Sequence, residues 1–347
     1  MIRDRFNLVV YFKLETHQFL SDFSDSSDPS KLQLLEKDDT DSGTLFRFSC
    51  TKIVYDALNI IWGDDSFLPS LTDKYWDFST KMLKNYLDWL ASVYRYLEID
   101  KNEIEGIEKW HILCALCSDC KLLDTSVFEL GLGSILERIR SLEASVDTTL
   151  FGECLTVFST LIEKQRDEVI LALCAHVTLA LNTVFDGVAD IPRQYRWTKK
   201  PMPTEASHYV IEAFNKFEAF KLEAERFGWS EEEIDSFSSK VATEVANAFC
   251  LKAEQVIESV EQTGTSLQRF KRKGAFSTNS ETSAVDSDES KIRNQLHIDL
   301  SFFRTKTSKF HLDTSSLDAL IARAKNPLSF EKETSSGSEQ TVKNVQS

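Results

Sequence analysis

The sequence predicts an all-α protein, and three observations support this fold class. Glycine and proline are scarce, with 11 glycines and 6 prolines in 347 residues, about 3% and 2% against usual values of roughly 7% and 5%. Because tight hairpins and phosphate-binding loops consume glycine, this shortage disfavours sheet-rich folds and nucleotide-binding enzymes. Apolar residues also recur at intervals of three and four along most of the chain, which is the spacing of amphipathic helices.

The first predicted domain is a set of helical bundles over residues 1–190. A solvated loop rich in serine and aspartate is expected at Ser24–Gly43, and an acidic connector at Glu98–Glu108. The long pattern at its end predicts a rod of about 50 Å, at a rise of 1.5 Å per residue. Helices are expected at Arg3–Phe23, Leu45–Trp62, Phe67–Leu97, Ile107–Leu123, Val127–Leu142 and Leu150–Val184.

The third of these segments carries an aromatic stripe at helical spacing. It includes Tyr75, Phe78, Tyr86 and Trp89. Such a stripe is typical of helices that pack against other helices, so we assign it to the core rather than to a ligand site.

Residues 191–203 are predicted to form a Pro-rich, basic hinge. Pro192, Pro201 and Pro203 lack the N–H that a helix interior needs, so no helix is expected to pass through. Thr204 is expected to cap the next helix.

Beyond the hinge, residues 204–268 are predicted to form a helical hairpin. Gly228 is placed to end its first helix, and Ser230 with Glu233 forms the capping box of its second. The composition then predicts a disordered linker at 269–288, C-terminal helices at 289–325 and a disordered tail at 326–347.

A cluster on the helix near residue 115 invites comparison with a metal site. It consists of His111, Cys114, Cys117 and Cys120. On a straight helix, Cys114 and Cys120 lie about 9 Å apart along the axis, whereas zinc holds each sulfur at about 2.3 Å. We therefore expect buried free thiols, and no metal or iron–sulfur cluster.

The sequence gives no sign of catalysis or of a cofactor. It contains no phosphate-binding glycine loop, no nucleophile elbow and no HExxH motif, and its six histidines are scattered. We therefore expect a protein that is not an enzyme.

Net charge and hydropathy set the predicted location. Forty basic and 55 acidic residues give a net charge of −15, which opposes general attraction to nucleic acid and anionic lipid. No run of about eighteen apolar residues is evident, and the amino end lacks a signal-peptide core. A cytosolic location with seven reduced cysteines is expected.

The hinge supplies the candidate partner-binding residues. Its basic and aromatic side chains could bind a protein or a lipid, stack on nucleic acid, or simply solvate an exposed loop. The candidates are Pro192, Arg193, Tyr195, Arg196, Lys199 and Lys200.

Four blocks of residues occur in a characteristic order. They are Arg5–Phe12, Ile60–Leu71 with Tyr75 and Trp76, Ile191–Arg196 with Pro203–Val210, and Asp288–Leu296 with Asp299. Together they resemble the C-terminal domain of subunit 2 of the conserved oligomeric Golgi complex, although Val9 stands where the family has proline. The family's N-terminal half, with its coiled coil, has no counterpart in this sequence.

The resemblance implies an elongated stack of tandem antiparallel helical bundles, of the CATCHR type found in multisubunit tethering complexes. Such a protein acts as a non-catalytic scaffold for vesicle tethering in retrograde transport within the Golgi. The implied partners are subunits 1, 3 and 4 of the complex, SNAREs, golgins and small GTPases, but not nucleic acid. The implied location is peripheral, on the cytoplasmic face of the Golgi membrane. The alternative is a helical-repeat adaptor, RNA-associated through the basic hinge.

Overall fold

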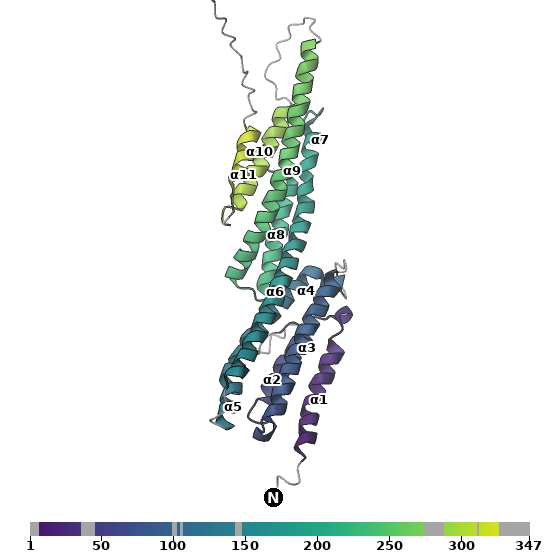
Figure 1. Cartoon of the computed structure of the whole chain (residues 1–347). Helices are drawn as coiled ribbons and strands as arrows, with labels where there is room; N and C mark the ends of the chain where they lie inside the picture. Colours follow the sequence, from purple (N-terminus) through teal and green to yellow (C-terminus); the bar gives the residue numbers. More distant parts are fainter. Residues whose placement is uncertain are drawn as a thin grey trace, which may run out of the picture. The chain divides into compact units, whose positions relative to one another are not determined.

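The computed structural model describes residues 7–35, 46–98, 103–104, 107–142, 148–273, 288–310 and 312–325. These residues are almost entirely helical, which confirms the predicted all-α fold class (Figure 1). Within them, the only paired strands are β1 (Glu103–Ile104) and β2 (Ile107–Glu108), which are antiparallel and lie in the predicted acidic connector.

The chain divides into two compact units. Unit 1 contains residues 1–184 and 212–245, and unit 2 contains residues 185–211 and 246–347. The first boundary therefore falls between Val184 and Phe185, before the predicted hinge. Three long helices contribute residues to both units: α6 (Thr149–Phe185), α8 (His208–Arg226) and α9 (Glu231–Lys273).

Unit 1 is built mainly from the helices that precede residue 184. The aromatic stripe of α3 is buried, as predicted, and the indole N–H of Trp62 in this core donates to the Ser79 hydroxyl at 2.9 Å. Its helices besides those shared with unit 2 are α1 (Leu8–Ser26), α2 (Ser49–Ile61), α3 (Thr72–Glu98), α4 (Lys109–Leu130) and α5 (Leu136–Leu142).

A buried carboxylate caps α2 from another helix. Asp119 of α4 accepts the backbone N–H groups of Arg47 at 2.7 Å and Phe48 at 2.9 Å, just before α2 begins. Burial raises the pKa of Asp119 to about 7, and these two N–H groups oppose the rise. Because Phe48 offers no capping side chain of its own, Asp119 supplies the acceptors that a helix N-terminus needs.

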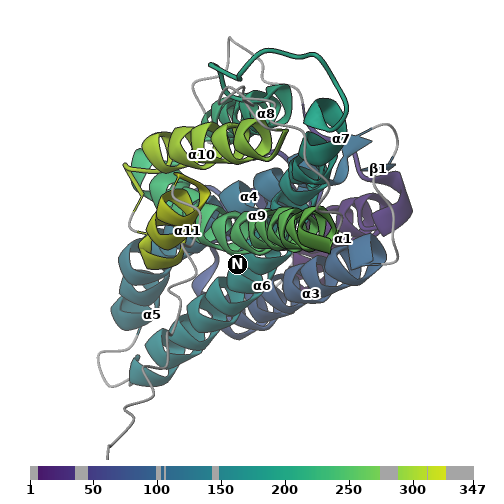
Figure 2. The same ribbon diagram turned by 90° about the horizontal axis from the view of Figure 1, so that it is seen from above.

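Unit 2 is organised around an aromatic core. The rings of Phe185, Phe249 and Phe303 lie within 5.6 Å of one another, centroid to centroid. A Cβ added at Gly187 would lie 2.8 Å from the Cβ of Tyr209, so this close approach requires glycine. The unit also contains α7 (Ile191–Tyr195), α10 (Asp288–Lys306) and α11 (Ser315–Lys325), of which α10 and α11 pack side by side (Figure 2).

Two predicted breaks are wrong. The helix at 107–123 does not end before Val127, because α4 continues to Leu130 and passes through a π-helical turn, Gly131–Ile135, into α5. Helix α9 continues to Lys273, so the first five residues of the predicted linker, 269–273, are helical. Neither place has a proline to stop the helix. The remainder of the linker up to 287 and the predicted tail lie outside the described residues.

One helical segment of the described chain is long and apolar enough to cross a membrane, judged by length and composition alone. It is Thr149–Tyr195, and 28% of its most apolar window is buried. The expectation that no segment could span a membrane is thus corrected. Polar residues such as His176 and Asn182 interrupt the run of consecutive apolar residues, but the mean hydropathy of the segment's most apolar window remains high, at 1.7. Membrane-spanning composition is also found in the core helices of soluble proteins, so the finding alone does not define a membrane segment.

Candidate interaction surface

The predicted hinge, residues 191–203, begins inside a helix. Pro192 lies in the first turn of α7, where its missing N–H breaks no intrahelical bond. The helical backbone thus enters the predicted hinge, but no helix passes through all three prolines. Helix α7 ends at Tyr195, and Arg196, whose N–H donates to the Pro192 carbonyl at 2.9 Å, has an extended backbone.

The segment that follows, residues 196–207, is called the Pro-rich segment below. Three polar side chains of α10 bind it. Asn294 donates to the Pro203 carbonyl at 2.8 Å, and Gln295 donates to the Glu205 carbonyl at 2.9 Å. The Pro203 and Glu205 carbonyls lie outside helices and strands, so these side chains supply the hydrogen bonds that secondary structure does not.

Asp299 of α10 makes the third and most extensive attachment. It is fully buried, and it accepts the backbone N–H and the hydroxyl of Ser207, both at 2.7 Å, and the Tyr209 hydroxyl at 2.8 Å. Burial raises its pKa, while these hydrogen bonds oppose the rise. The predicted helix start at Thr204 is wrong: α8 begins at His208, directly after the Ser207 N–H that Asp299 accepts.

The structure separates the six predicted partner-binding residues into buried and exposed groups. Tyr195 is buried, and its hydroxyl donates to Gln295 at 2.8 Å, so the prediction that it contacts a partner is corrected to a structural role. Pro192 and Arg196 are half-buried. Arg193, Lys199 and Lys200 are exposed.

Trp197 is a residue that the predicted set omitted. Its side chain is 92% exposed, and its φ of 60° is unusual for a bulky residue. Its backbone N–H donates to Asp288 at 2.9 Å, a contact that helps to hold this conformation. The only sequence signal was an aromatic residue between basic ones.

Four exposed side chains thus form what we call the basic surface: Arg193, Trp197, Lys199 and Lys200. Two carboxylates lie close to this surface and partly offset its positive charge. Arg193 lies 3.5 Å from Asp190, and Asp288 accepts the Trp197 backbone N–H. The surface can offer cations and one indole ring to a partner, but its described residues contain no nucleophile or metal-ligand set.

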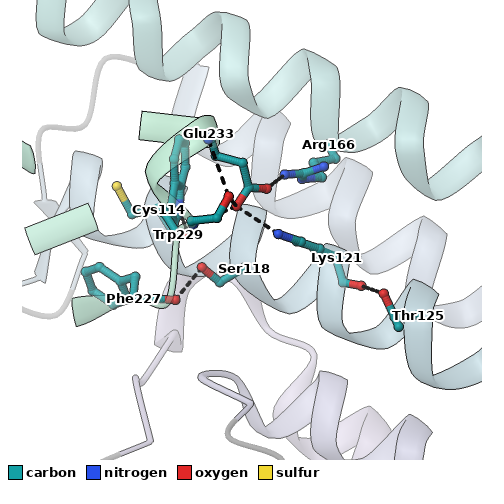
Figure 3. A network of polar contacts seen from close by, with 9 residues as sticks. Cys114, Ser118, Lys121, Thr125, Arg166, Phe227, Trp229 and Glu233 are labelled. Carbon is teal, nitrogen blue, oxygen red and sulfur yellow. Dashed lines mark hydrogen bonds and ion pairs between the residues drawn. The ribbon is translucent and has the colours of Figure 1, made fainter. Parts of the chain in front are cut away.

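The second organised site is the α8–α9 junction in unit 1 (Figure 3). Gly228 has a φ of 85°, the left-handed conformation predicted for the residue that ends a helix. Ser230 and Glu233 form the predicted capping box: the Ser230 N–H donates to Glu233 at 2.9 Å, and the Glu233 N–H donates to the Ser230 hydroxyl at 3.4 Å. Both predictions are confirmed.

Glu233 also joins α9 to two other helices. Its carboxylate pairs with Lys121 of α4 at 2.9 Å and with Arg166 of α6 (Figure 3). Burial alone would raise the pKa of Glu233, but the hydrogen bonds from Lys121 and Ser230 outweigh it and lower the pKa to about 2. The carboxylate is therefore charged at neutral pH.

Backbone contacts fix the rest of the junction. Ser118 donates to the Phe227 carbonyl at 2.6 Å, and the indole N–H of Trp229 donates to the Cys114 carbonyl at 3.3 Å. A pocket of about 450 Å³ lies here, lined in part by Lys121, Arg166 and Glu233. Because Lys121 and Arg166 pair with Glu233, their charges are already used within the chain. We therefore assign these residues to the stability of the junction and not to anion binding.

The cysteine cluster is buried, as predicted. Cys114, Cys117 and Cys120 are free thiols inside unit 1, and burial raises the pKa of Cys120 to about 12. At neutral pH such thiols are protonated and are poor nucleophiles. In the described part of the chain, no group of three potential metal ligands converges.

Comparisons with known proteins agree with the resemblance. A family model described as "COG complex component, COG2, C-terminal" matches residues 4–300. Conserved oligomeric Golgi complex subunit 2 of Caenorhabditis elegans is 34% identical over 87% of this chain and 42% of its own length. The subunit 2 proteins of Drosophila melanogaster and Arabidopsis thaliana are 25% and 21% identical, over 91% and 89% of this chain and 45% and 42% of their own lengths.

The chain thus spans less than half the length of each of these relatives. No solved structure matches it.

Proposed function

The chain belongs to the family of C-terminal regions of COG complex subunit 2, and from this premise we propose that it is the C-terminal part of a Golgi tethering subunit. Its work is that of a scaffold in vesicle tethering during retrograde transport within the Golgi. The observation that carries this proposal is the family match over residues 4–300, which covers nearly all of unit 1 and the part of unit 2 up to residue 300.

The chemistry of the buried polar groups supports a scaffold without catalysis. Asp119 caps α2, Asp299 holds residues 196–207 and Glu233 braces the α8–α9 junction. Each of these carboxylates is used by backbone or side-chain donors of the chain itself. The donors of the chain itself thus occupy these three carboxylates, which is the arrangement expected of structural groups.

The proposed partners are the sibling subunits of the complex, subunits 1, 3 and 4. SNAREs, golgins and small GTPases are further proposed partners, and the basic surface is the region we assign to such contacts. Its cations are exposed and its backbone is held by Asp288 and the neighbouring α10 contacts, so binding orders few residues that are not already ordered. The proposed location is the cytoplasmic face of the Golgi membrane, by peripheral attachment.

Affinity purification tests this proposal. The tagged chain is purified from its own cells, and the co-purifying proteins are identified by mass spectrometry. We expect sibling subunits of the Golgi tethering complex to be recovered in excess over a purification with an unrelated tagged helical protein. Recovery of none, in cells where another tagged subunit does recover its siblings, would contradict the proposal.

A further inference from the structure

Helix α6 carries an exposed apolar stripe outside its buried face, and the N-terminal part of this stripe borders a pocket shared with α3. Leu171 and Leu179 are 64% and 68% exposed, whereas Val169, Leu173 and Val177 are buried. Exposed leucines of this size on one helix are unusual for a surface that meets only water. We call the exposed side the α6 stripe; its apolar members are Leu150, Cys154, Val157, Leu161, Leu171, Ala175 and Leu179.

The α6 stripe has the spacing of a coiled-coil seam. From Cys154 to Thr178 its positions alternate between steps of three and four, which is the heptad pattern of a helix that packs along another helix. An exposed Lys164 and a half-buried Glu168 occupy the two central positions. The positions are 154, 157, 161, 164, 168, 171, 175 and 178.

This pattern matches itself after a two-fold rotation. When two copies of α6 are laid antiparallel, with the two-fold axis midway between positions 164 and 168 on the stripe side, Lys164 of each copy faces Glu168 of the other. The same rotation places Leu161 opposite Leu171. Val157 then faces Ala175, and Cys154 faces Thr178. Every layer therefore pairs an a position of one copy with a d position of the other.

We propose that the α6 stripe is a homodimer interface in which two copies of this chain pack α6 against α6, antiparallel. Symmetric dimers use one self-complementary patch, in which residue i contacts residue j and j contacts i. The central layers supply that property twice over, by shape in the Leu161–Leu171 layers and by charge in the Lys164–Glu168 layers. Over the 25 residues from 154 to 178, the seam would extend about 37 Å.

Charge and burial favour a second copy over a lipid bilayer as the occupant. The stripe has Lys164 and Glu168 at its centre, where a bilayer would require apolar groups. The opposite side of α6 is already buried in the chain through Val169, Leu173 and Val177. A second copy, in contrast, pairs both charges. This inference does not depend on the proposed function.

Charge reversal on the intact 347-residue chain tests the register. Sedimentation velocity over a range of concentrations should show a monomer–dimer equilibrium for the unchanged chain. Lys164→Glu places two pairs of like charges in the seam, as does Glu168→Lys, and either should weaken dimerisation at least about tenfold. The double variant Lys164→Glu/Glu168→Lys restores opposite pairs and should recover the original affinity.

Mixing the two single variants gives the sharpest outcome. The Lys164→Glu chain carries two acidic residues and the Glu168→Lys chain two basic ones, so they should form heterodimers more strongly than either self-associates. Glu163→Lys is the matched control, because Glu163 is exposed, adjacent in sequence and about 100° around the helix from Lys164. It should leave dimerisation unchanged.

Circular dichroism of each variant shows whether its fold is intact. A chain that is monomeric at every concentration would overturn the proposal. So would a dimer that Lys164→Glu leaves unchanged, since the copies would then meet through another face.

Discussion

The α8–α9 junction and the Pro-rich segment 196–207 both separate consecutive helices, but they are held by contacts of different range. At the junction, Gly228 ends one helix, and Ser230 and Glu233 start the next through hydrogen bonds three residues apart. In the Pro-rich segment, Ser207 is fixed by Asp299, which lies 92 residues further along the chain. One break is thus specified by neighbouring residues, whereas the conformation of the other is fixed by side chains of α10.

This difference has a thermodynamic consequence. A local cap forms with its helix, so its removal costs about the value of one capping interaction. A distant buried carboxylate satisfies several donors at once, so its removal leaves all of them unpaired in the interior. We therefore expect the largest loss of stability where buried donors lose their acceptor, smaller losses at the α8–α9 junction, and the smallest at an exposed side chain.

The largest effect is expected for Asp299→Ala. The variant strands the N–H and hydroxyl of Ser207 and the hydroxyl of Tyr209 in a buried site. Each unsatisfied buried group costs about 1–3 kcal/mol. Because some of the three donors can turn to other acceptors or to water, we expect a total loss of about 3 kcal/mol in the free energy of unfolding. Urea denaturation measures it.

Asp299→Asn is the matched control, since the amide keeps one acceptor and the same shape. It should cost less than the alanine variant. A loss below about 1 kcal/mol for Asp299→Ala would mean that the Pro-rich segment is held by other contacts, and the contrast between the two breaks would fail.

A smaller effect is expected for Glu233→Gln at the junction. Glutamine can still cap α9 through Ser230, but it removes the charge that pairs with Lys121 and Arg166. We expect a loss of about 1 kcal/mol at pH 7, since partly exposed ion pairs contribute little each.

The pH dependence identifies the source of that loss. The folded state lowers the pKa of Glu233 from 4.5 to about 2, so its charge stabilises the fold above the unfolded-state pKa. This contribution is lost as the pH falls from about 4.5 to about 2. The stability difference between the original chain and Glu233→Gln should therefore vanish across this interval; a difference independent of pH would contradict the ion-pair account.

Gly228→Ala tests the local cap alone. No atom lies within 4 Å of the added Cβ, so the cost comes only from the φ of 85°. A left-handed conformation costs a non-glycine residue about 1 kcal/mol. Thermal or urea unfolding should show a loss of that size, with Gly152→Ala, in open space within α6, as a control that should be neutral or stabilising. An equal response at both glycines would show that backbone conformation at Gly228 is not limiting.

The smallest effect is expected for Trp197→Ala. Because the side chain is 92% exposed and makes no core contact, the free energy of unfolding should change by less than about 0.5 kcal/mol. Co-purification of sibling subunits with the variant then reports on binding without a change in fold. A large loss of stability would show that Trp197 is structural, and would remove it from the basic surface.

The sequence was sufficient where the determining residues are close together. Helical spacing predicted α3 and α6, and Gly228 with Ser230 and Glu233 predicted the α8–α9 junction. The burial of Cys114 and Cys120 was also predicted, because free cysteines on a helix face behave as small hydrophobic residues. These are properties of one or two turns of backbone, which a short window of sequence contains.

The sequence was insufficient where a distant residue decides the local structure. Nothing near Thr204 indicates that α8 starts at His208, because the decisive acceptor is Asp299. Tyr195 continues the apolar spacing of Val188 and Ile191, which indicates burial, but its hydroxyl partner, Gln295, lies 100 residues away and has no local signal. The position of Pro192 was undetermined for another reason: a proline that is excluded from a helix interior is favoured in a first turn, so it does not by itself fix where the helix ends.

Hydrogen–deuterium exchange read at single amides tests most directly the central claim that polar contacts with α10 hold the Pro-rich segment and the basic surface in place. The decisive amides are those of Ser207 and Trp197, which donate to Asp299 and Asp288. We expect slow exchange at both amides in the unchanged chain, and selective loss of protection at Ser207 in Asp299→Ala, which removes the acceptor. Exchange at Ser207 as fast as in an unstructured peptide would contradict it, because the Pro-rich segment would then not be held against α10.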